Sequence, residues 1–451
     1  MRFLIDNLAL VRHADIRVEG ISLIASPNGS GKSTISRGLA TFASLGQRMP
    51  RLVQTWRFRK ILQSVEEALK KNGIQFLFMS DPTEFPLEWY HELFTRDFWM
   101  SCELFKKWLQ VNFLGSAKQR ARMGAVFPSD YFTKDEFAGR FSEVAGVVLK
   151  VVSLTDAQVA SDVAMLAMDS AFHGDWSSLS YLNDDTVLSL EDDSTSMSVQ
   201  INAERHHANG MNLGARFFTS VFYLEPIHAL DFAERLDKVS SFVLHDRYMA
   251  GAAEPVRLLA STRKIASWPA DFPVKKESVL SRIEEIVHGH LEENVETLMY
   301  REHLSDGTTR SLKLVNMASG MKPLSALARA IEKGAILPGG LLIIDEPESS
   351  LHPAWQVAFS GFLCWLSAQC QIKLLLNTHS PYFLRAIDVA SRREHCERNC
   401  HYYVMRQCHN DYRRSTECVD GVIDQIYEEM HRPFSLLREE VPVEEEEATH
   451  D

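Results

Sequence analysis

The segment from Ser26 to Thr34 constrains the fold of this chain more than any other. It contains Ser-Pro-Asn-Gly-Ser-Gly-Lys-Ser-Thr, follows the apolar stretch 21–25 and precedes a segment with helical character. A Gly-rich loop between a buried strand and a helix presents backbone N–H groups and the positive end of the helix dipole to an anion. The pattern is therefore typical of a phosphate-binding P-loop.

The residue types in this loop predict its contacts. Lys32 is expected to reach the β and γ oxygens of a nucleotide, and Ser33 to ligate Mg²⁺. Ser26 stands where the pattern usually has its first glycine, and a serine can adopt the backbone that the loop needs. The other expected nucleotide contacts are Asn28, Gly29, Ser30, Gly31 and Thr34.

A second candidate element is the acidic pair Asp345-Glu346, which ends the apolar run 341–344. Helical and strand-like segments alternate from 317 to 390, which favours a parallel α/β sheet, and such sheets bind ligands at the carboxyl ends of their strands. Asp345 suits a contact to Mg²⁺ through water, and Glu346 suits the general base that polarises an attacking water. Because a P-loop is present, we prefer this interpretation to a charged strand end that serves solubility.

Two more segments have the form of ligand sites. Ser319 and Gly320 precede an amphipathic helix at 324–332 and so form a second candidate anion site. His379 follows an apolar strand at 374–376. Alone, such a histidine is more often structural than catalytic.

Together these segments resemble the ATP-binding-cassette (ABC) class of ATPase. Within that class, Asp345-Glu346-Pro347-Glu348 and Thr378-His379-Ser380-Pro381-Tyr382 are similar to the branch of RecF, structural-maintenance-of-chromosomes (SMC) and OLD proteins. The resemblance covers roughly 1–60, 185–235 and 290–435. The matching motifs are Walker A (Ser26–Thr34), the signature (Ala318–Lys322), Walker B (Leu341–Glu346), the D-loop (Ser349–Pro353) and the switch histidine (His379).

The resemblance implies ATP and Mg²⁺ as cofactors and a homodimer, or a higher homo-oligomer, in which two heads enclose ATP. Ser319 and Gly320 of one head would then meet the γ-phosphate bound to the other, and His379 would contact the γ-phosphate of its own head. The signature departs from Leu-Ser-Gly-Gly-Gln because Ala318, Met321 and Lys322 replace the leucine, the second glycine and the glutamine. No Q-loop glutamine can be assigned.

The motifs divide the chain into an ABC-ATPase head with a P-loop core sheet and a mostly helical insertion. The expected parts are an N-terminal lobe with Walker A (1–60), the insertion (61–185), a return to the head with a helical lid (186–300), a C-terminal lobe with the remaining motifs (301–438) and a disordered acidic tail (439–451). Residues 1–25 are expected to form two strands, 2–11 and 21–25. Helices are expected from Lys32 into the forties, at 229–260 and at 276–290.

The spacing of the motifs and the residues outside them restrict which class of ATPase the chain resembles. The P-loop and the signature lie too far apart for a transporter subunit, no long heptad array is present, and too few residues follow His379 for a Toprim nuclease domain. The chain therefore resembles stand-alone OLD-like ATPases of anti-phage systems such as PARIS and Septu. This resemblance implies a sensor or regulator of a separate toxin or nuclease effector, with the insertion as sensor or docking surface.

The alternative is a RecF-like DNA-binding ATPase of DNA repair or maintenance. From Lys32 to Gln63 the sequence has no acidic residue, and Trp56 and Phe58 alternate with Arg57 and Arg59, which suits phosphate contacts and base stacking. A solvated face or a docking site for an acidic partner explains the same residues equally well, since the net charge is −12. DNA thus stays a possible partner.

The composition bears on the cellular compartment of the protein and on whether it binds a metal ion. No apolar run is long enough to span a membrane, and the 7 cysteines favour a reducing cytoplasm over a disulfide-stapled fold. Four cysteines and three histidines between His395 and Cys418 suggest either a zinc site or isolated residues on a hairpin. The aromatic-rich segment 85–113 is expected to form a buried face of the helical insertion.

Overall fold

The computed structural model describes residues 1–71, 136–174, 176, 184–202, 207–209, 215–224, 265–293, 298–409, 411–428 and 430. The expected aromatic helices at 85–113, the helix at 229–260 and the acidic tail at 439–451 lie outside these residues.

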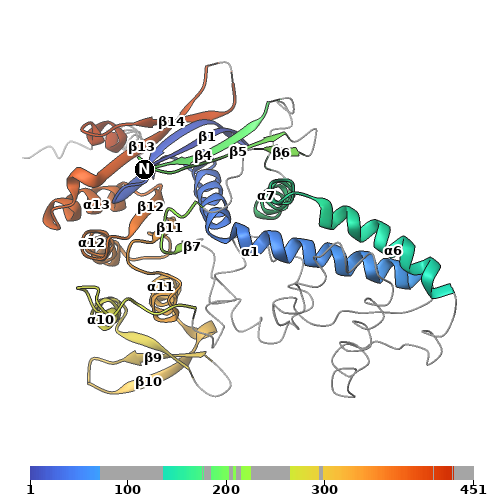
Figure 1. Cartoon of the computed structure of the whole chain (residues 1–451). Helices are drawn as coiled ribbons and strands as arrows, with labels where there is room; N and C mark the ends of the chain where they lie inside the picture. Colours follow the sequence, from blue (N-terminus) through green and yellow to red (C-terminus); the bar gives the residue numbers. More distant parts are fainter. Residues whose placement is uncertain are drawn as a thin grey trace, which may run out of the picture.

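A mixed sheet forms the centre of the fold (Figure 1). Among the described residues it has 11 strands in the order β6-β5-β4-β1-β2-β14-β13-β3-β12-β11-β7, of which β13 to β7 are mutually parallel. The strands β3 and β11 are buried along their whole length, as expected where helices cover both faces of a parallel sheet. The α/β fold class is confirmed. The strands are β1 (Arg2–Leu8), β2 (Val11–Arg17), β3 (Ile21–Ala25), β4 (Thr186–Glu191), β5 (Ser196–Asn202), β6 (His207–Asn209), β7 (Val221–Leu224), β11 (Leu341–Asp345), β12 (Lys373–Thr378), β13 (Cys400–Gln407) and β14 (Arg414–Cys418).

The N-terminal strand prediction is wrong in one respect. The expected strand 2–11 ends at Leu8, and the chain turns back as β2, which pairs antiparallel with β1. The tight turn requires a left-handed backbone at Ala9, whose φ is 48°. Nothing in the sequence marks this turn, because alanine is an uncommon residue at positive φ.

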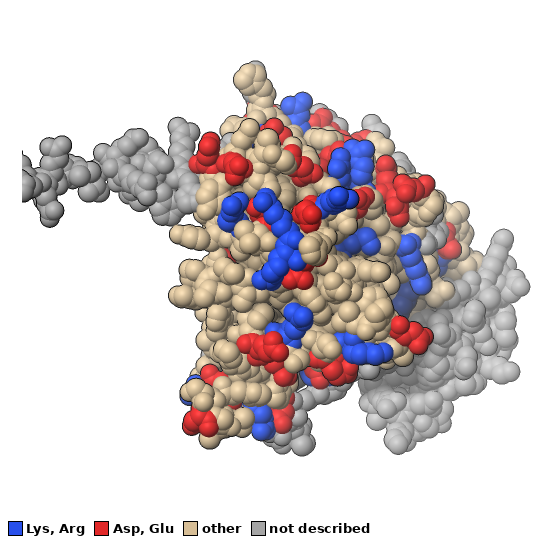
Figure 2. All heavy atoms as spheres, turned by 90° about the vertical axis from the view of Figure 1, so that its left-hand side faces the viewer, with Lys and Arg blue, Asp and Glu red and all other residues tan. Residues whose placement is uncertain are grey.

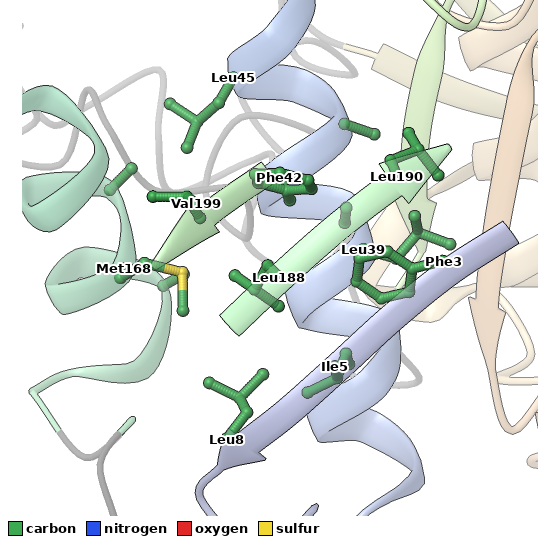
Figure 3. Close-up of a cluster of buried hydrophobic side chains, with 14 of the residues drawn as sticks. Phe3, Ile5, Leu8, Leu39, Phe42, Leu45, Met168, Leu188, Leu190 and Val199 are labelled. Carbon is green, nitrogen blue, oxygen red and sulfur yellow. The ribbon is translucent and has the colours of Figure 1, made fainter. Parts of the chain in front are cut away.

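Two apolar cores lie on the two faces of this sheet. Helix α1 (Lys32–Lys71) and helix α7 (Asp156–Phe172) cover one face, where Phe42 and Leu39 of α1 pack against Phe3, Leu188 and other strand residues (Figure 3). Four helices pack on the opposite face and contribute to the second core. They are α10 (Lys276–Val287), α11 (Met321–Lys333), α12 (Pro353–Cys370) and α13 (Pro381–Arg393). Helix α10 confirms the helix expected at 276–290.

A small antiparallel sheet lies beside α10 and α11 (Figure 1). It consists of β8 (Gly289–Glu293), β9 (Leu298–His303) and β10 (Thr309–Lys313). Two short 3-10 helices span 314–316 and 397–399.

Helix α1 is longer than the sequence predicts. It begins at Lys32 and continues through Pro50 to Lys71, so the expected boundary between 60 and 61 falls inside it. Figure 1 shows that α1 changes direction partway and that its second half lies beside α6 (Glu136–Ser153). Pro50 explains such a bend, because it cannot donate to the carbonyl of Gly46 and its ring crowds that carbonyl. The described part of the predicted insertion is helical.

Arg57 fixes the junction between α6 and α7. Its guanidinium donates hydrogen bonds to the carbonyl oxygens of Val151 (3.2 Å) and Leu154 (2.6 Å) and to Asp156 (2.7 Å), and its side chain is 12% exposed. Val151 lies in the last turn of α6, where its carbonyl also accepts from the N–H of Leu154 (3.3 Å), and Leu154 lies just beyond the helix end, where the regular helical donors stop. The neighbouring Trp56 and Phe58 are buried in the structure. The stacking surface suggested by their alternation with arginines is therefore absent at these two residues.

No single helix within the described residues is long and apolar enough to cross a membrane. The bent pair 145–153 and 156–172 meets that test by length and composition alone, and much of α7 is buried in the first core.

We predict that Arg57→Ala lowers the free energy of unfolding by about 1–3 kcal/mol, because it removes the donor that serves these carbonyls. Arg51→Ala, at an exposed position of the same helix, is the control and should change stability by less than about 0.5 kcal/mol. Urea denaturation of both variants measures the difference. Equal effects of the two substitutions would contradict the assigned role of Arg57.

Candidate functional site

Three predicted motifs meet at one edge of the sheet. Strand β12 pairs in parallel with β3 on one side and with β11 on the other, so the carboxyl ends of all three strands adjoin. The P-loop follows β3, the acidic pair ends and follows β11, and His379 follows β12. The sheet therefore brings together the candidate residues that the sequence separates.

The P-loop has the backbone that phosphate binding needs. Gly29 and Gly31 have φ values of 70° and 97°, a region that side-chain-bearing residues rarely adopt. Asn28, Gly29 and Ser33 are exposed and Thr34 is half-buried, while the hydroxyl of Ser30 is buried and has no hydrogen-bond partner within the described structure. An orphaned hydroxyl and exposed loop residues beside a helix N-terminus fit an anionic ligand.

Lys32 folds back onto this loop. Its Nζ donates to the carbonyl oxygens of Ser26 (2.6 Å) and Pro27 (2.9 Å). Burial lowers the pKa of Lys32, and the carboxylates of Glu346, Glu348 and Asp345 oppose that shift. A buried ammonium next to three carboxylates is suited to exchange its carbonyl partners for phosphate oxygens.

Ser26 explains the departure from the usual first glycine. Its φ is not positive, so no glycine is required there. Its Oγ accepts a hydrogen bond from the backbone N–H of Met405 (2.8 Å) and donates to the carbonyl of Ala25 (2.6 Å). The serine therefore fastens the start of the P-loop to β13.

Asp345 is the buried, hydrogen-bonded member of the acidic pair. It is 2% exposed, and its carboxylate accepts hydrogen bonds from Asn377 Nδ2 (2.5 Å) and from the Tyr223 hydroxyl (2.8 Å). Asn377 Nδ2 also donates to Ser36 Oγ (2.7 Å) on the first turns of α1. Asp345 is thereby connected to the helix that follows the P-loop.

The expected Mg²⁺ ligands are consistent with a hard cation. Ser33 offers an exposed hydroxyl and Asp345 a carboxylate, and the buried Oδ1 of Asn377 has no hydrogen-bond partner among the described residues. Oxygen donors of this kind are the ones that Mg²⁺ prefers.

Glu346 and His379 face each other. His379 Nδ1 lies 3.5 Å from Glu346 Oε1, and Ser349 Oγ donates to the other oxygen of Glu346 at 3.2 Å. Glu346 has a φ of 49°, and its N–H donates to the carbonyl of Asn377 (2.8 Å). A left-handed backbone at a glutamate costs on the order of 1–3 kcal/mol and is found mostly at functional sites. Both side chains are partly exposed, as a group that meets a ligand must be.

The signature segment packs against the D-loop. Gly320 precedes α11, and a Cβ at this position would lie 2.7 Å from the carbonyl oxygen of Ser350. Ser319 is exposed, the first turn of α11 has no acidic residue, and no side chain caps it. Ser319 and Gly320 thus lie at a helix N-terminus, as predicted.

Four residues near the site were not singled out from the sequence. Asn377 and Tyr223 donate hydrogen bonds to Asp345, and Glu348 accepts one from the segment that contains His379. Besides burial, the positive charge of Arg414 contributes to the lowered pKa of Lys32. Glu348 and Asn377 lie within or beside the recognised motifs, so their positions in the sequence could have identified them as site residues. No pattern in the sequence distinguishes Tyr223 or Arg414.

The C-terminal cysteines and histidines are spread over several elements. The thiol of Cys396 contacts those of Cys364 and Cys400, whereas Cys408 hydrogen-bonds Ser415 and Cys418 ends β14. Throughout the described ranges, no group of three or more His, Cys, Asp or Glu side chains is arranged to hold a metal ion. The zinc interpretation therefore gains no support from the described residues.

A Gly-rich loop, an acidic pair and a histidine thus lie at the adjoining ends of three parallel strands, an arrangement suited to a phosphate-bearing ligand. Residues 178–385 match a family model described as "AAA domain, putative AbiEii toxin, Type IV TA system". The match spans the signature, Walker B and the switch histidine, covers less than half of the chain and does not include the P-loop. No curated protein matches the chain at a significant level.

Solved structures of SMC heads are similar over most of the chain. The SMC head domain from Thermotoga maritima is 12% identical and covers 93% of this chain and 98% of its own, with a TM-score of 0.35. An SMC head bound to the C-winged helix domain of ScpA is 10% identical, with coverages of 94% and 98% and a TM-score of 0.41. A head with an extended coiled coil, bound to a ScpA domain and derived from Pyrococcus furiosus, is 10% identical, with coverages of 97% and 98% and a TM-score of 0.37.

We predict that Tyr223→Phe lowers the free energy of unfolding by about 1–3 kcal/mol, because one buried oxygen of Asp345 loses its donor. Tyr382→Phe, at a tyrosine that is 60% exposed, is the control and should be nearly neutral. Thermal unfolding in the absence of nucleotide measures both variants. A Tyr223 variant as stable as the wild type would show that the hydroxyl is not needed by Asp345.

Proposed function

We propose that the chain is an ATPase that binds ATP with Mg²⁺ at the P-loop and hydrolyses it to ADP and phosphate. The observation that supports this most is the meeting of Lys32, Asp345, Glu346 and His379 at one sheet edge. Glu346 and His379 are partly exposed, whereas Lys32 and Asp345 are buried beside them. The proposal extends to all the loop residues named above, Asn28 to Thr34.

The geometry suggests how these residues act. Lys32 exchanges the carbonyls of Ser26 and Pro27 for β and γ oxygens, and Ser33 and Asp345 hold the Mg²⁺, which neutralises phosphate charge when bound. Glu346 accepts a proton from the water that attacks the γ-phosphorus, and the bond to the bridging oxygen of ADP breaks. His379 orients Glu346 and donates to the γ-phosphate from its exposed side.

We infer that two copies enclose the nucleotide. The N-terminus of α1 already serves the P-loop, whereas the N-terminus of α11, with Ser319 exposed, has no acidic or capping side chain. A second uncommitted anion site on the same chain fits the phosphate held by a partner copy. The resemblance to the ABC class supports this arrangement, and higher homo-oligomers are compatible with it.

The biological role that we propose is regulation of a separate toxin or nuclease in anti-phage defence. Support comes from the OLD-like motif pattern. The description of the matching family model concerns a toxin–antitoxin system but names the AAA domain itself as the putative toxin, so it does not bear on a separate effector. The competing DNA-clamping function has less support, since Trp56 and Phe58 are buried and Arg57 binds helix carbonyls. On the face drawn in Figure 2, basic and acidic side chains alternate, and no broad basic surface is visible.

We predict that Lys32→Ala abolishes ATP binding and that Glu346→Gln retains binding but lowers kcat by about 100-fold or more, the usual contribution of a general base. The Glu346 variant should accumulate as a nucleotide-bound dimer. Steady-state phosphate release and light scattering with ATP measure the two effects. Normal hydrolysis by Glu346→Gln would exclude it as the base.

The regulatory role is tested by purifying the tagged Glu346→Gln variant from its native host with and without ATP. Recovery of a toxin or nuclease in stoichiometric amount supports the role. Recovery of DNA alone contradicts it and favours the RecF-like function.

A further inference from the structure

Glu348 is a buried acid to which neither the sequence motifs nor the proposed hydrolysis gives a role. It lies in the turn between β11 and α12 and is 5% exposed. One carboxylate oxygen, Oε1, accepts three hydrogen bonds, from Thr378 Oγ1 (2.6 Å) and from the backbone N–H groups of His379 (3.0 Å) and Ser380 (3.1 Å). All three donors belong to the segment that holds the switch histidine.

The second oxygen of Glu348 is buried and accepts no hydrogen bond from the described residues. Burial is also the main cause that raises the pKa of Glu348. A charged group under these conditions costs folding free energy, and a neutral side chain of the same shape would stabilise the chain more. A costly charge next to the reacting groups indicates a functional requirement.

The same turn contacts the catalytic base and the signature. Ser349, the next residue, donates to Glu346 Oε2, and the carbonyl of Ser350 packs against Gly320. Ser350 has a φ of 63°, so the turn holds a second left-handed residue besides Glu346. The five residues 346–350 thus contact the base, the switch segment and the surface offered to a partner copy.

We propose that Glu348 is a positioning residue that ties the switch segment 378–380 to the D-loop. By fixing this segment, Glu348 keeps His379 Nδ1 3.5 Å from Glu346 Oε1. This inference rests on the proposed ATPase function and names a positioning residue of that same site.

The decisive variant is Glu348→Gln, which keeps the shape and an oxygen for the three donors but removes the charge. We expect kcat at saturating ATP to fall about 10- to 100-fold, as for a modest misplacement of catalytic groups, while the Kd for ATP changes less than about twofold. The Tm should not fall, because a buried charge is removed. A merely structural residue would instead lose stability and keep its kcat.

Double-mutant cycles identify the residue through which Glu348 acts. In a His379→Ala background, Glu348→Gln should cause almost no further loss of kcat. If Glu348→Gln does not fold, Thr378→Val removes one of the three donors and should give a smaller loss of the same kind. Asp388→Asn is the control: Asp388 is 4% exposed in α13 and ion-paired with Arg385 and Arg392, so its replacement should lower Tm and leave kcat intact.

Unchanged kcat in Glu348→Gln, or losses that simply multiply with those of His379→Ala, would overturn the inference and leave the ATPase function standing. Absence of hydrolysis by the wild type, or equal hydrolysis by Lys32→Ala, overturns the proposed function and the inference with it. The two failures are therefore distinguishable from one set of rate measurements.

Discussion

The site depends on two hydrogen bonds from one buried amide. Asn377, which is fully buried in β12, donates from Nδ2 both to Asp345 on β11 and to Ser36 on α1. The parallel pairing of β11, β12 and β3 brings these elements together, but strand register alone does not fix the helix that follows the P-loop. The amide does so, because Ser36 lies one turn beyond Lys32 and Ser33. The candidate phosphate loop and the carboxylate suited to Mg²⁺ are thus held in fixed relative positions.

Burying the charged groups of this site costs folding free energy. Lys32, Asp345 and Glu348 are each at most 5% exposed, and burial disfavours the charged forms of Lys32 and Glu348. Their mutual attraction recovers only part of that cost. A phosphate chain with its metal would add the missing partners. A site assembled in this way gains stability from its ligand, since binding to the folded chain alone shifts the folding equilibrium.

Much of this arrangement could be predicted from the sequence. The P-loop and the acidic pair were identifiable because strand, loop and helix patterns place functional residue types at strand ends, and the structure brings Lys32, Glu346 and His379 together as expected. The role of Tyr223 could not be predicted, since its strand joins β11 only through tertiary pairing. The turn at Ala9 and the full length of α1 were missed for local reasons, because alanine gives no turn signal and Pro50 normally ends a helix.

The length of α1 changes how the insertion relates to the site. The predicted boundary between residues 60 and 61 would separate the two, whereas one helix joins Lys32 of the P-loop to Arg57, which binds the junction of α6 and α7. The first half of this helix packs on the sheet and its second half pairs with α6 (Figure 1). The helix that α6 packs against is therefore the same helix that begins at the P-loop. Any partner that binds the insertion is therefore connected to the P-loop by a continuous hydrogen-bonded backbone, interrupted at the single carbonyl of Gly46 that Pro50 cannot serve.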